Sequence, residues 1–322
     1  MSKRKSFLSP YVEAFTSYRK ASDNWCDFYE RMIWAFERHC ADNHPDSDIL
    51  TQEMVDNWCK QHENEINNSC RARIYAVVNF VRYLRKRGQT NVNEPLIPKK
   101  ERVTFIPHAF TQAELDDFFS ACDNLPKTPN RKEIRARKII VPVLFRLLYS
   151  SGIRTYEARM LRCCDVDLQN GILNIRQSKG RGNQHYVVLH DSMLSLMREY
   201  DAAIETLCPG RIYFFPSPNG KHYGKDWIIV NFKKLWASTD KPHATAYAFR
   251  HHYATQNINR WTDEGFAFDD KFTYLSKSMG HYDIESTKYY YSLTPGFANI
   301  LEEKTNVDFE DIVPEVEYEA VE

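Results

Sequence analysis

Residues Met279–Tyr291 combine residue types that can do covalent chemistry. His281 follows a glycine, and Asp283 is placed to cap a short helix. That helix would carry three consecutive tyrosines, Tyr289, Tyr290 and Tyr291. Successive helical residues point about 100° apart, so only one of the three can reach a shared target. A tyrosine hydroxyl near a histidine can act as a covalent nucleophile, although aromatic core packing would explain the same residues.

Further upstream, separate segments carry cations and imidazoles. Arg154 follows a glycine turn at a predicted helix start, where free backbone N–H groups suit an anion. Lys179 lies in a glycine-rich turn between two predicted strands, and Arg250 precedes His251 and His252 on a predicted helix. We expect no metal site, because no third ligand lies at metal spacing from the two histidines. Each residue alone is also consistent with an ordinary surface or core position.

The elements that position these residues are predicted to be mostly helical. Apolar spacing indicates two helices over about 9–40, a third from Thr51 and a fourth over about 66–87 that stops at Gly88. The fourth helix carries a basic arc of Arg71, Arg82, Arg85 and Lys86, and Arg73 and Arg87 add to its positive charge. Such an arc would lie well against phosphates, or would simply be a solvated basic face.

The second half is predicted to contain more helices and one small antiparallel sheet. A capping box from Thr111 opens its first helix. A buried helix over about 131–149, which Gly152 should end, contains Pro142, which should kink or split it. The other predicted helices are a short one capped by Thr155 and those over about 191–207, 226–237, 245–259 and 274–278. The predicted strands are 172–176 and 186–189.

We therefore expect a mainly α-helical fold of two domains. The predicted parts are a helical domain over 1–98, an extended linker over 99–110, a second domain over 111–293, and a C-terminal helix with an acidic tail over 294–322. Basic side chains of the linker and of the strand-connecting turn would touch a threaded polyanion, namely Lys99, Lys100 and Arg181.

Charge and cysteine content support this interpretation. The net charge of the 322-residue chain is zero, but residues 292–322 hold nine acidic residues and one lysine, which leaves 42 basic and 34 acidic residues, or +8, on the rest. A basic body suits a polyanion. None of the eight cysteines forms a Cys-x-x-Cys pair, no apolar run is long enough for a membrane span, and no secretory signal follows the basic start. We expect reduced thiols in a cytoplasm.

Taken together, these segments resemble the tyrosine recombinases, the phage integrase family. The matching motifs are Ser151-Gly-Ile-Arg154 with Glu157, Lys179-Gly, Arg250-His251-x-x-Ala254-Thr255, Gly280-His281, and Tyr290 nine residues after the histidine. Their order and spacing agree over about 111–293, and residues 8–88 resemble more loosely the helical core-binding domain of that family.

The resemblance implies an activity. Two domains would clamp double-stranded DNA as a C, and a homotetramer would exchange strands between two synapsed sites through a Holliday junction, without ATP, metal or another cofactor. The protein would be the integrase or transposase of a mobile element. A type IB topoisomerase and a catalytically idle DNA-binding regulator are the alternatives.

The resemblance also implies roles for individual residues. Tyr290 would attack the scissile phosphate and hold a 3′-phosphotyrosine. Arg154 and Arg250 would grip the non-bridging oxygens. Lys179 would protonate the leaving 5′ oxygen, and His281 would donate a further hydrogen bond to the phosphate.

One position departs from the family pattern. The family usually has histidine three residues before the second arginine, where this chain has Tyr247, and a phenol is a poor general base. His243 lies one turn earlier and is an alternative, although Pro242 leaves its helical placement open. Glu157 would orient the arginine side of the site, and His251 is a second supporting residue.

The segment after the tyrosines is predicted to act between protomers. Phe297, Ile300 and Leu301 fall on one face of a helix from about Thr294 that is too short to be stable alone. In the resembling family the corresponding helix docks on a neighbouring protomer, and docking on its own domain is the alternative.

Overall fold

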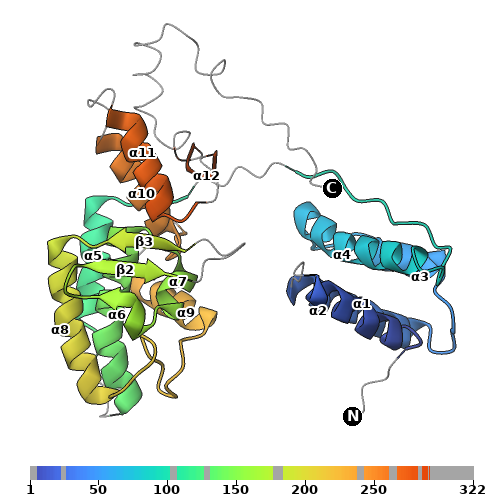
Figure 1. Cartoon of the computed structure of the whole chain (residues 1–322), viewed down its shortest axis with the longest axis horizontal. Coiled ribbons are helices and arrows are strands. Elements are labelled where there is room, and N and C mark those ends of the chain that lie inside the picture. The colour runs from blue at the N-terminus through green and yellow to red at the C-terminus, as the bar shows by residue number, and fades with distance from the viewer. Residues whose placement is uncertain are drawn as a thin grey trace, which may run out of the picture. The chain divides into compact units, whose positions relative to one another are not determined.

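The computed structural model describes residues 6–22, 27–101, 107–126, 131–176, 184–237, 243–260, 267–281, 285–288 and 290. The chain divides into two compact units, Met1–Phe105 and Ile106–Glu322 (Figure 1). Each unit has its own hydrophobic core. The division falls within the segment 99–110 for which the sequence predicts a linker.

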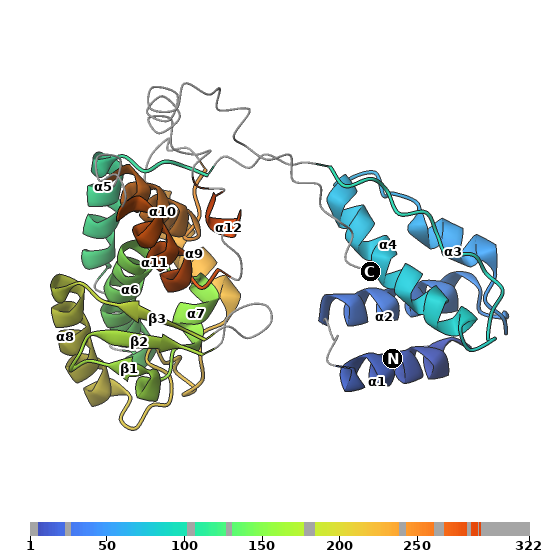
Figure 2. The same ribbon diagram turned by 45° about the horizontal axis from the view of Figure 1, so that its top comes forward.

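The described part of the first unit is helical. Its helices are α1 (Ser9–Ala21), α2 (Asp27–Asn43), α3 (Gln52–Cys59) and α4 (Asn67–Arg85). Helix α4 is central, because the other three pack against it, and Figure 2 shows it crossing α2. Its Phe80 is fully buried and meets Phe15 edge to face, with ring centroids 5.4 Å apart. Helix α3 follows Thr51, where the sequence predicts a helix start, and Thr51 caps it by accepting a hydrogen bond from the N–H of Met54.

After α4 the chain returns along this helix as an extended segment held by polar side chains. The Asn68 amide pairs with the backbone of Glu101, since its Nδ2 donates to the carbonyl at 2.8 Å and its Oδ1 accepts from the N–H at 3.0 Å. Arg71 Nη1 donates to the Pro98 carbonyl at 2.7 Å. The start of the predicted linker therefore belongs structurally to the first unit. Its exposed cations are Lys99 and Lys100.

The second unit is mostly helical with one antiparallel sheet of order β1–β2–β3 (Figures 1 and 2). Its helices are α5 (Gln112–Asp123), α6 (Lys132–Ser151), α7 (Thr155–Met160), the 3₁₀ helix η1 (Cys163–Asp165), α8 (Asp191–Leu207), α9 (Lys225–Trp236), α10 (Ala248–Arg260), α11 (Ala267–Ser278) and α12 (Glu285–Lys288). The strands are β1 (Val166–Asp167), β2 (Ile172–Ile175) and β3 (His185–Val188). No helix in the described ranges is long and apolar enough to cross a membrane.

Helix α6 forms the centre of the second unit. It packs against α5, α8 and α10, and its Ile140 and Phe145 are fully buried. Pro142 lies inside α6 without ending it, so the predicted split does not occur. Gly152 follows the helix in the left-handed conformation, with φ 63°, and stops it.

The sheet alternates in burial, as one covered face requires. Leu173 and Val187 point into the core, whereas Tyr186 and Val188 are exposed. The last paired residues before the connecting turn are Ile175 and His185. Helix α11 lies against β3, which brings the sheet next to the segment that follows α11.

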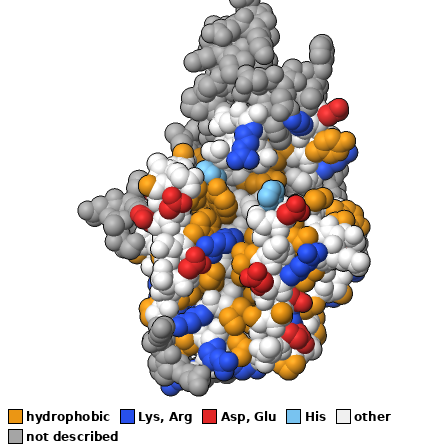
Figure 3. Space-filling view, turned by 90° about the vertical axis from the view of Figure 1, so that its left-hand side faces the viewer, with side chains coloured by type: hydrophobic (Ala, Val, Ile, Leu, Met, Phe, Trp, Pro, Cys, Tyr) orange, Lys and Arg blue, Asp and Glu red, His pale blue; other side chains and the backbone are white. Residues whose placement is uncertain are grey.

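One side of the second unit carries mixed charge. Figure 3 shows acidic and basic side chains interspersed with apolar ones on the side of α8. Among the described residues visible there, no patch of one sign stands out. A surface that binds a polyanion needs an excess of positive charge, and the described residues on this side show none.

Several local boundaries differ from the sequence-based predictions, and the largest difference is that α11 begins at Ala267 rather than near 274. The N-cap of α7 is Arg154 rather than Thr155, which is its first helical residue. Helix α10 begins at Ala248, three residues later than predicted. Helix α12 ends at Lys288, so the predicted short helix does not carry Tyr290, which lies in a turn beyond it. Tyr289 and Tyr291 lie outside the described residues.

Candidate active site

Arg250 of α10 is 1% exposed, and its guanidinium joins three segments. Nη1 donates to the Gly152 carbonyl at 2.6 Å, and Nη2 donates to the Met279 carbonyl at 2.7 Å. Nη2 also lies 2.9 Å from Nε2 of His281. Among the described residues Nε has no hydrogen-bond partner. Burial lowers the pKa of Arg250, and the positive charge of Arg154 lowers it further.

Gly152 permits this arrangement because it has no side chain. A Cβ at this position would lie 2.3 Å from Cδ1 of Tyr253, so the tyrosine ring of α10 packs directly on the glycine backbone. The close approach of α10 to the end of α6 therefore needs both the positive φ and the missing Cβ.

Arg154 is held by a buried carboxylate. Its Nη1 pairs with Glu157 Oε1 at 2.6 Å, and its backbone N–H donates to Oε2 at 2.7 Å. Glu157 is 1% exposed, so it acts as a fixed counter-charge from behind, the position the sequence predicts for it. Arg154 Nη2 also donates to the Gly280 carbonyl at 3.3 Å, which brings the start of α7 to the end of α11.

His281 bridges Arg250 and α12. Its Nδ1 lies 2.6 Å from Thr287 Oγ1, and Thr287 is fully buried. Since arginine can only donate, Nε2 accepts the contact with Arg250, and Nδ1 then carries the proton and donates to the threonine hydroxyl. Thr287 is a site residue that sequence reasoning missed. Its six-residue offset from His281 was the available signal.

Tyr290 lies inside this cluster and is 3% exposed. Its ring stacks on His281 with centroids 6.1 Å apart and packs in an apolar group that includes Phe272, Leu275 and Met279. Burial raises the pKa of Tyr290 to about 12, and the positive charge of Arg250 partly opposes that shift. The phenol is therefore neutral in this arrangement and adjacent to the cation that could activate it.

Tyr247 and His251 lie on the edge of the cluster. Tyr247 is 43% exposed and meets the His251 ring edge to face at 5.1 Å. The His251 ring is 5.5 Å from that of Tyr290. Burial, with the charge of Arg250, lowers the pKa of His251 to about 4, so its imidazole is neutral at pH 7. His243 is exposed and precedes α10, so helical spacing does not place it on the face of Tyr247.

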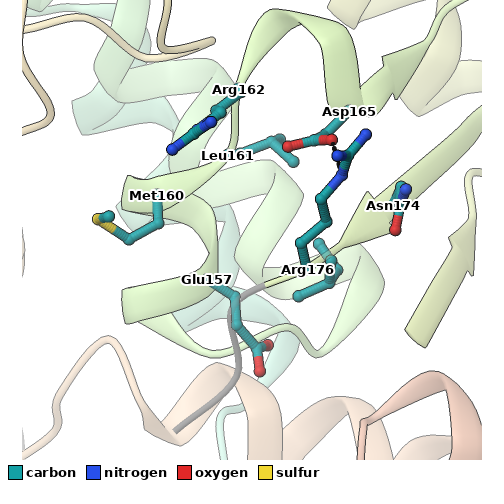
Figure 4. A pocket seen from close by; sticks show the side chains of 8 residues that line it. Glu157, Met160, Leu161, Arg162, Asp165, Asn174 and Arg176 are labelled. Atoms are coloured by element: carbon teal, nitrogen blue, oxygen red, sulfur yellow. Dashed lines mark ion pairs between the residues drawn. The ribbon is translucent and has the colours of Figure 1, made fainter. Parts of the chain in front are cut away.

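Two predicted residues, Lys179 and Arg181, lie outside the described residues. The ends of the turn that carries them are described. A small hollow of about 90 Å³, open to solvent, lies beside β2 (Figure 4). Its polar lining includes Arg162, Asp165 and Arg176.

No group of three or more His, Cys, Asp or Glu side chains that could hold a metal ion occurs in the described ranges.

The predicted basic arc of α4 is only partly a surface. Arg73 turns inward, where it pairs with Glu65 at 2.7 Å and donates to the Lys60 carbonyl, and its side chain is 7% exposed. Its predicted contact with DNA is wrong, because the guanidinium is used within the unit. Arg82 pairs with Glu94 at 2.8 Å, so the positive charge of Arg82 is balanced by the carboxylate and the pair has no net charge. The remaining exposed cations of the arc are Arg85 and Lys86.

Comparison with known proteins decides the family. Residues 108–296, more than half of the chain, match the phage integrase family. The chain belongs to this family. It is similar to the integrase/recombinase y4rB of Sinorhizobium fredii, with 27% identity over 210 residues, 62% of this chain and 65% of that relative, just under two thirds of its length. It is also 21% identical over 301 residues to the tyrosine recombinase XerD of Rickettsia bellii, covering 88% of this chain and 93% of XerD.

A solved structure shows the same fold. A lambda integrase tetramer bound to a Holliday junction matches with a TM-score of 0.58 and 14% identity, covering 86% of this chain and 77% of the integrase chain. The predicted tyrosine-recombinase fold, mainly α with a small antiparallel sheet, is therefore confirmed.

Proposed function

We propose that this family member is a site-specific DNA recombinase that cleaves and rejoins DNA through a 3′-phosphotyrosine. The observation that carries the proposal is the convergence of Arg154, Arg250, His281 and Tyr290, from separate segments of the chain, within one partly buried cluster. Two guanidinium groups beside a phenol match what attack on a phosphodiester needs, namely charge stabilisation next to a nucleophile.

In the proposed reaction, Tyr290 Oη gives its proton to a water molecule, bonds to the scissile phosphorus and displaces the 5′ oxygen. Arg154 and Arg250 hold the non-bridging oxygens as negative charge develops on them. Lys179 gives its proton to the departing 5′ oxygen. The bond energy is kept in the phosphotyrosine, and attack by a 5′ hydroxyl of another strand reverses the step. No ATP or metal enters this sequence.

Two features of the cluster bear on how a phosphate binds. Arg250 uses three of its five N–H groups on Gly152, Met279 and His281, so a phosphate binds the N–H of Nε or the second N–H of Nη1, or displaces one of these partners. His281 accepts from Arg250 through Nε2, so it can donate to the phosphate only after that contact breaks or the ring takes up a proton. We propose that DNA binding rearranges both residues and so exposes Tyr290.

The proposed assembly is a homotetramer in which each protomer clamps duplex DNA as a C. The parts of that clamp are the domains 1–98 and 111–293, joined by the linker 99–110. The similarity to a lambda integrase that assembles as a tetramer on a Holliday junction supports this assembly. We also propose that the protein serves a mobile element in the cytoplasm.

We propose that the helix after Thr294 docks on the neighbouring protomer. Truncation before Thr294 should keep single-site binding and lose two-site complexes on native gels; intact two-site complexes would argue against docking between protomers.

Trapping covalent protein–DNA adducts on genomic DNA and sequencing the attached ends tests the function and identifies the site. On a nicked suicide substrate with that site, Tyr290→Phe should form no adduct yet still bind DNA. Tyr274→Phe is the matched control, because Tyr274 is 69% exposed on α11. An adduct from Tyr290→Phe would show that the nucleophile is misassigned. Rapid relaxation of a supercoiled plasmid without the site would favour a topoisomerase.

A further inference from the structure

The β2–β3 hairpin is anchored at both ends by contacts that the proposed function does not use. At the first end, Arg176 directly follows β2, and its Nε lies 2.5 Å from Oδ1 of Asp165 (Figure 4). The Asp165 side chain is 5% exposed, whereas that of Arg176 is 58% exposed. The arginine therefore reaches inward from the surface to a buried carboxylate on η1.

A buried carboxylate strongly constrains its partner. Removing a cation from a buried ion pair leaves an uncompensated charge in a poorly solvated place, which is far more costly than losing an exposed pair. The pair is an electrostatic contact through Nε, because Oδ1 of Asp165 has no aligned hydrogen-bond partner among the described residues. The contact with Asp165 thus ties the residue at the end of β2 to η1, the segment that follows α7.

At the second end, His185 opens β3 and pairs with Ile175. Its ring lies directly on Gly280, because a Cβ at that glycine would be 2.5 Å from His185 Cε1 and 2.6 Å from Nδ1. The Gly280 carbonyl accepts from Arg154, and the next residue is His281. This end of the hairpin therefore touches the active-site cluster itself.

We infer that Asp165 and Arg176 are positioning residues for Lys179, which follows Arg176 by three residues in the sequence. The inference rests on the proposed function, in which Lys179 protonates the leaving 5′ oxygen. A general acid must lie within hydrogen-bond reach of the atom it protonates, and a displacement of about 1 Å can slow a reaction on the order of a hundredfold. The ion pair sets the point from which the turn bearing Lys179 departs.

The test compares two leaving groups on the suicide substrate described above. One substrate has the natural 5′-bridging oxygen and the other has sulfur in its place. A thiol has a pKa of about 8.5, so the thiolate leaves without a proton and needs no general acid. Asp165→Asn should slow cleavage about tenfold or more on the oxygen substrate and stay within about threefold of wild type on the sulfur substrate. Arg176→Lys, which keeps the charge, should lose less activity on the oxygen substrate than Arg176→Gln, which removes it.

Two controls separate the possible outcomes. Asp123→Asn removes an exposed pair with Arg146 far from the turn in sequence, and should leave both rates unchanged. Lys179→Ala should show the same sulfur rescue as Asp165→Asn, with a larger loss on oxygen. If Lys179→Ala is rescued and Asp165→Asn is slowed equally on both substrates, the positioning role is overturned and the proposed function stands. If Lys179→Ala is not rescued, the proposed role of Lys179 fails, and the positioning role fails with it.

If Asp165→Asn does not fold, Arg176→Gln tests the same pair from its exposed side. Circular dichroism and DNA binding establish that the variant is folded. Selective loss on the oxygen substrate supports the inference, and equal loss on both substrates overturns it.

Discussion

Replacing Gly152 by alanine should destabilise the second unit by two separable effects. The residue has φ 63°, and the left-handed region costs a residue with a Cβ about 1–2 kcal/mol. The added Cβ would lie 2.3 Å from Cδ1 and 2.9 Å from Cγ of Tyr253, so the ring must move, and forced repacking costs about 1–3 kcal/mol. The expected total is roughly 2–5 kcal/mol.

Gly210 provides a matched control within the same unit. Its φ is 68°, and no atom lies within 4 Å of an added Cβ, so Gly210→Ala carries the backbone cost alone. Urea denaturation of both variants, followed by circular dichroism, measures the two losses. Gly152→Ala should be less stable than Gly210→Ala by about 1–3 kcal/mol. Equal losses would refute the argued contact with Tyr253.

The same substitution should also reach the active site. The Gly152 carbonyl accepts from Arg250 Nη1 at 2.6 Å, so a shift of this backbone moves a group placed on the phosphate. At a temperature where both variants are folded, Gly152→Ala should cleave the suicide substrate more slowly than Gly210→Ala. Equal cleavage rates would show that Arg250 does not depend on this carbonyl for its position.

Three further predictions concern single groups. Tyr247→Phe should slow cleavage about tenfold, or roughly 1.4 kcal/mol, whereas Arg250→Ala should cost a hundredfold or more, because it removes a charged clamp; equal losses in measured rates would contradict this order. In the folded protein the pKa of His251 is lowered to about 4, so its contribution to stability is present above pH 6.5 and is lost as pH falls toward 4. The free energy of unfolding of His251→Gln, measured in urea, should therefore depend less on pH in that window than that of the wild type. Neutralising Arg85 and Lys86 should weaken binding to cognate and random duplex alike and flatten the salt dependence; a loss confined to the cognate site would indicate base readout.

Much of this protein is determined locally, and the sequence alone therefore predicts it. Helix α8 occupies 191–207 as predicted, because the periodicity of apolar residues depends only on neighbours along the chain. The same holds for the capping box from Thr111 to Glu114 and for the helix stop at Gly152. The resemblance to the tyrosine recombinases likewise rested on short motifs in order, and the family match confirms it.

Contacts between distant segments were decided only by the tertiary structure. A helical arc shows which residues share a side but not what packs there, so the inward turn of Arg73 toward Glu65 was not predictable. The partners of Arg250 are main-chain carbonyls, which every residue has and no sequence pattern marks.

The contact of His185 with Gly280 joins residues 95 positions apart and depends on a missing Cβ. Residue type and spacing thus determine which groups can do the chemistry. Which of them meet, and which are consumed in holding the fold, follows from packing, because burial forces each polar group to find whatever partner lies beside it.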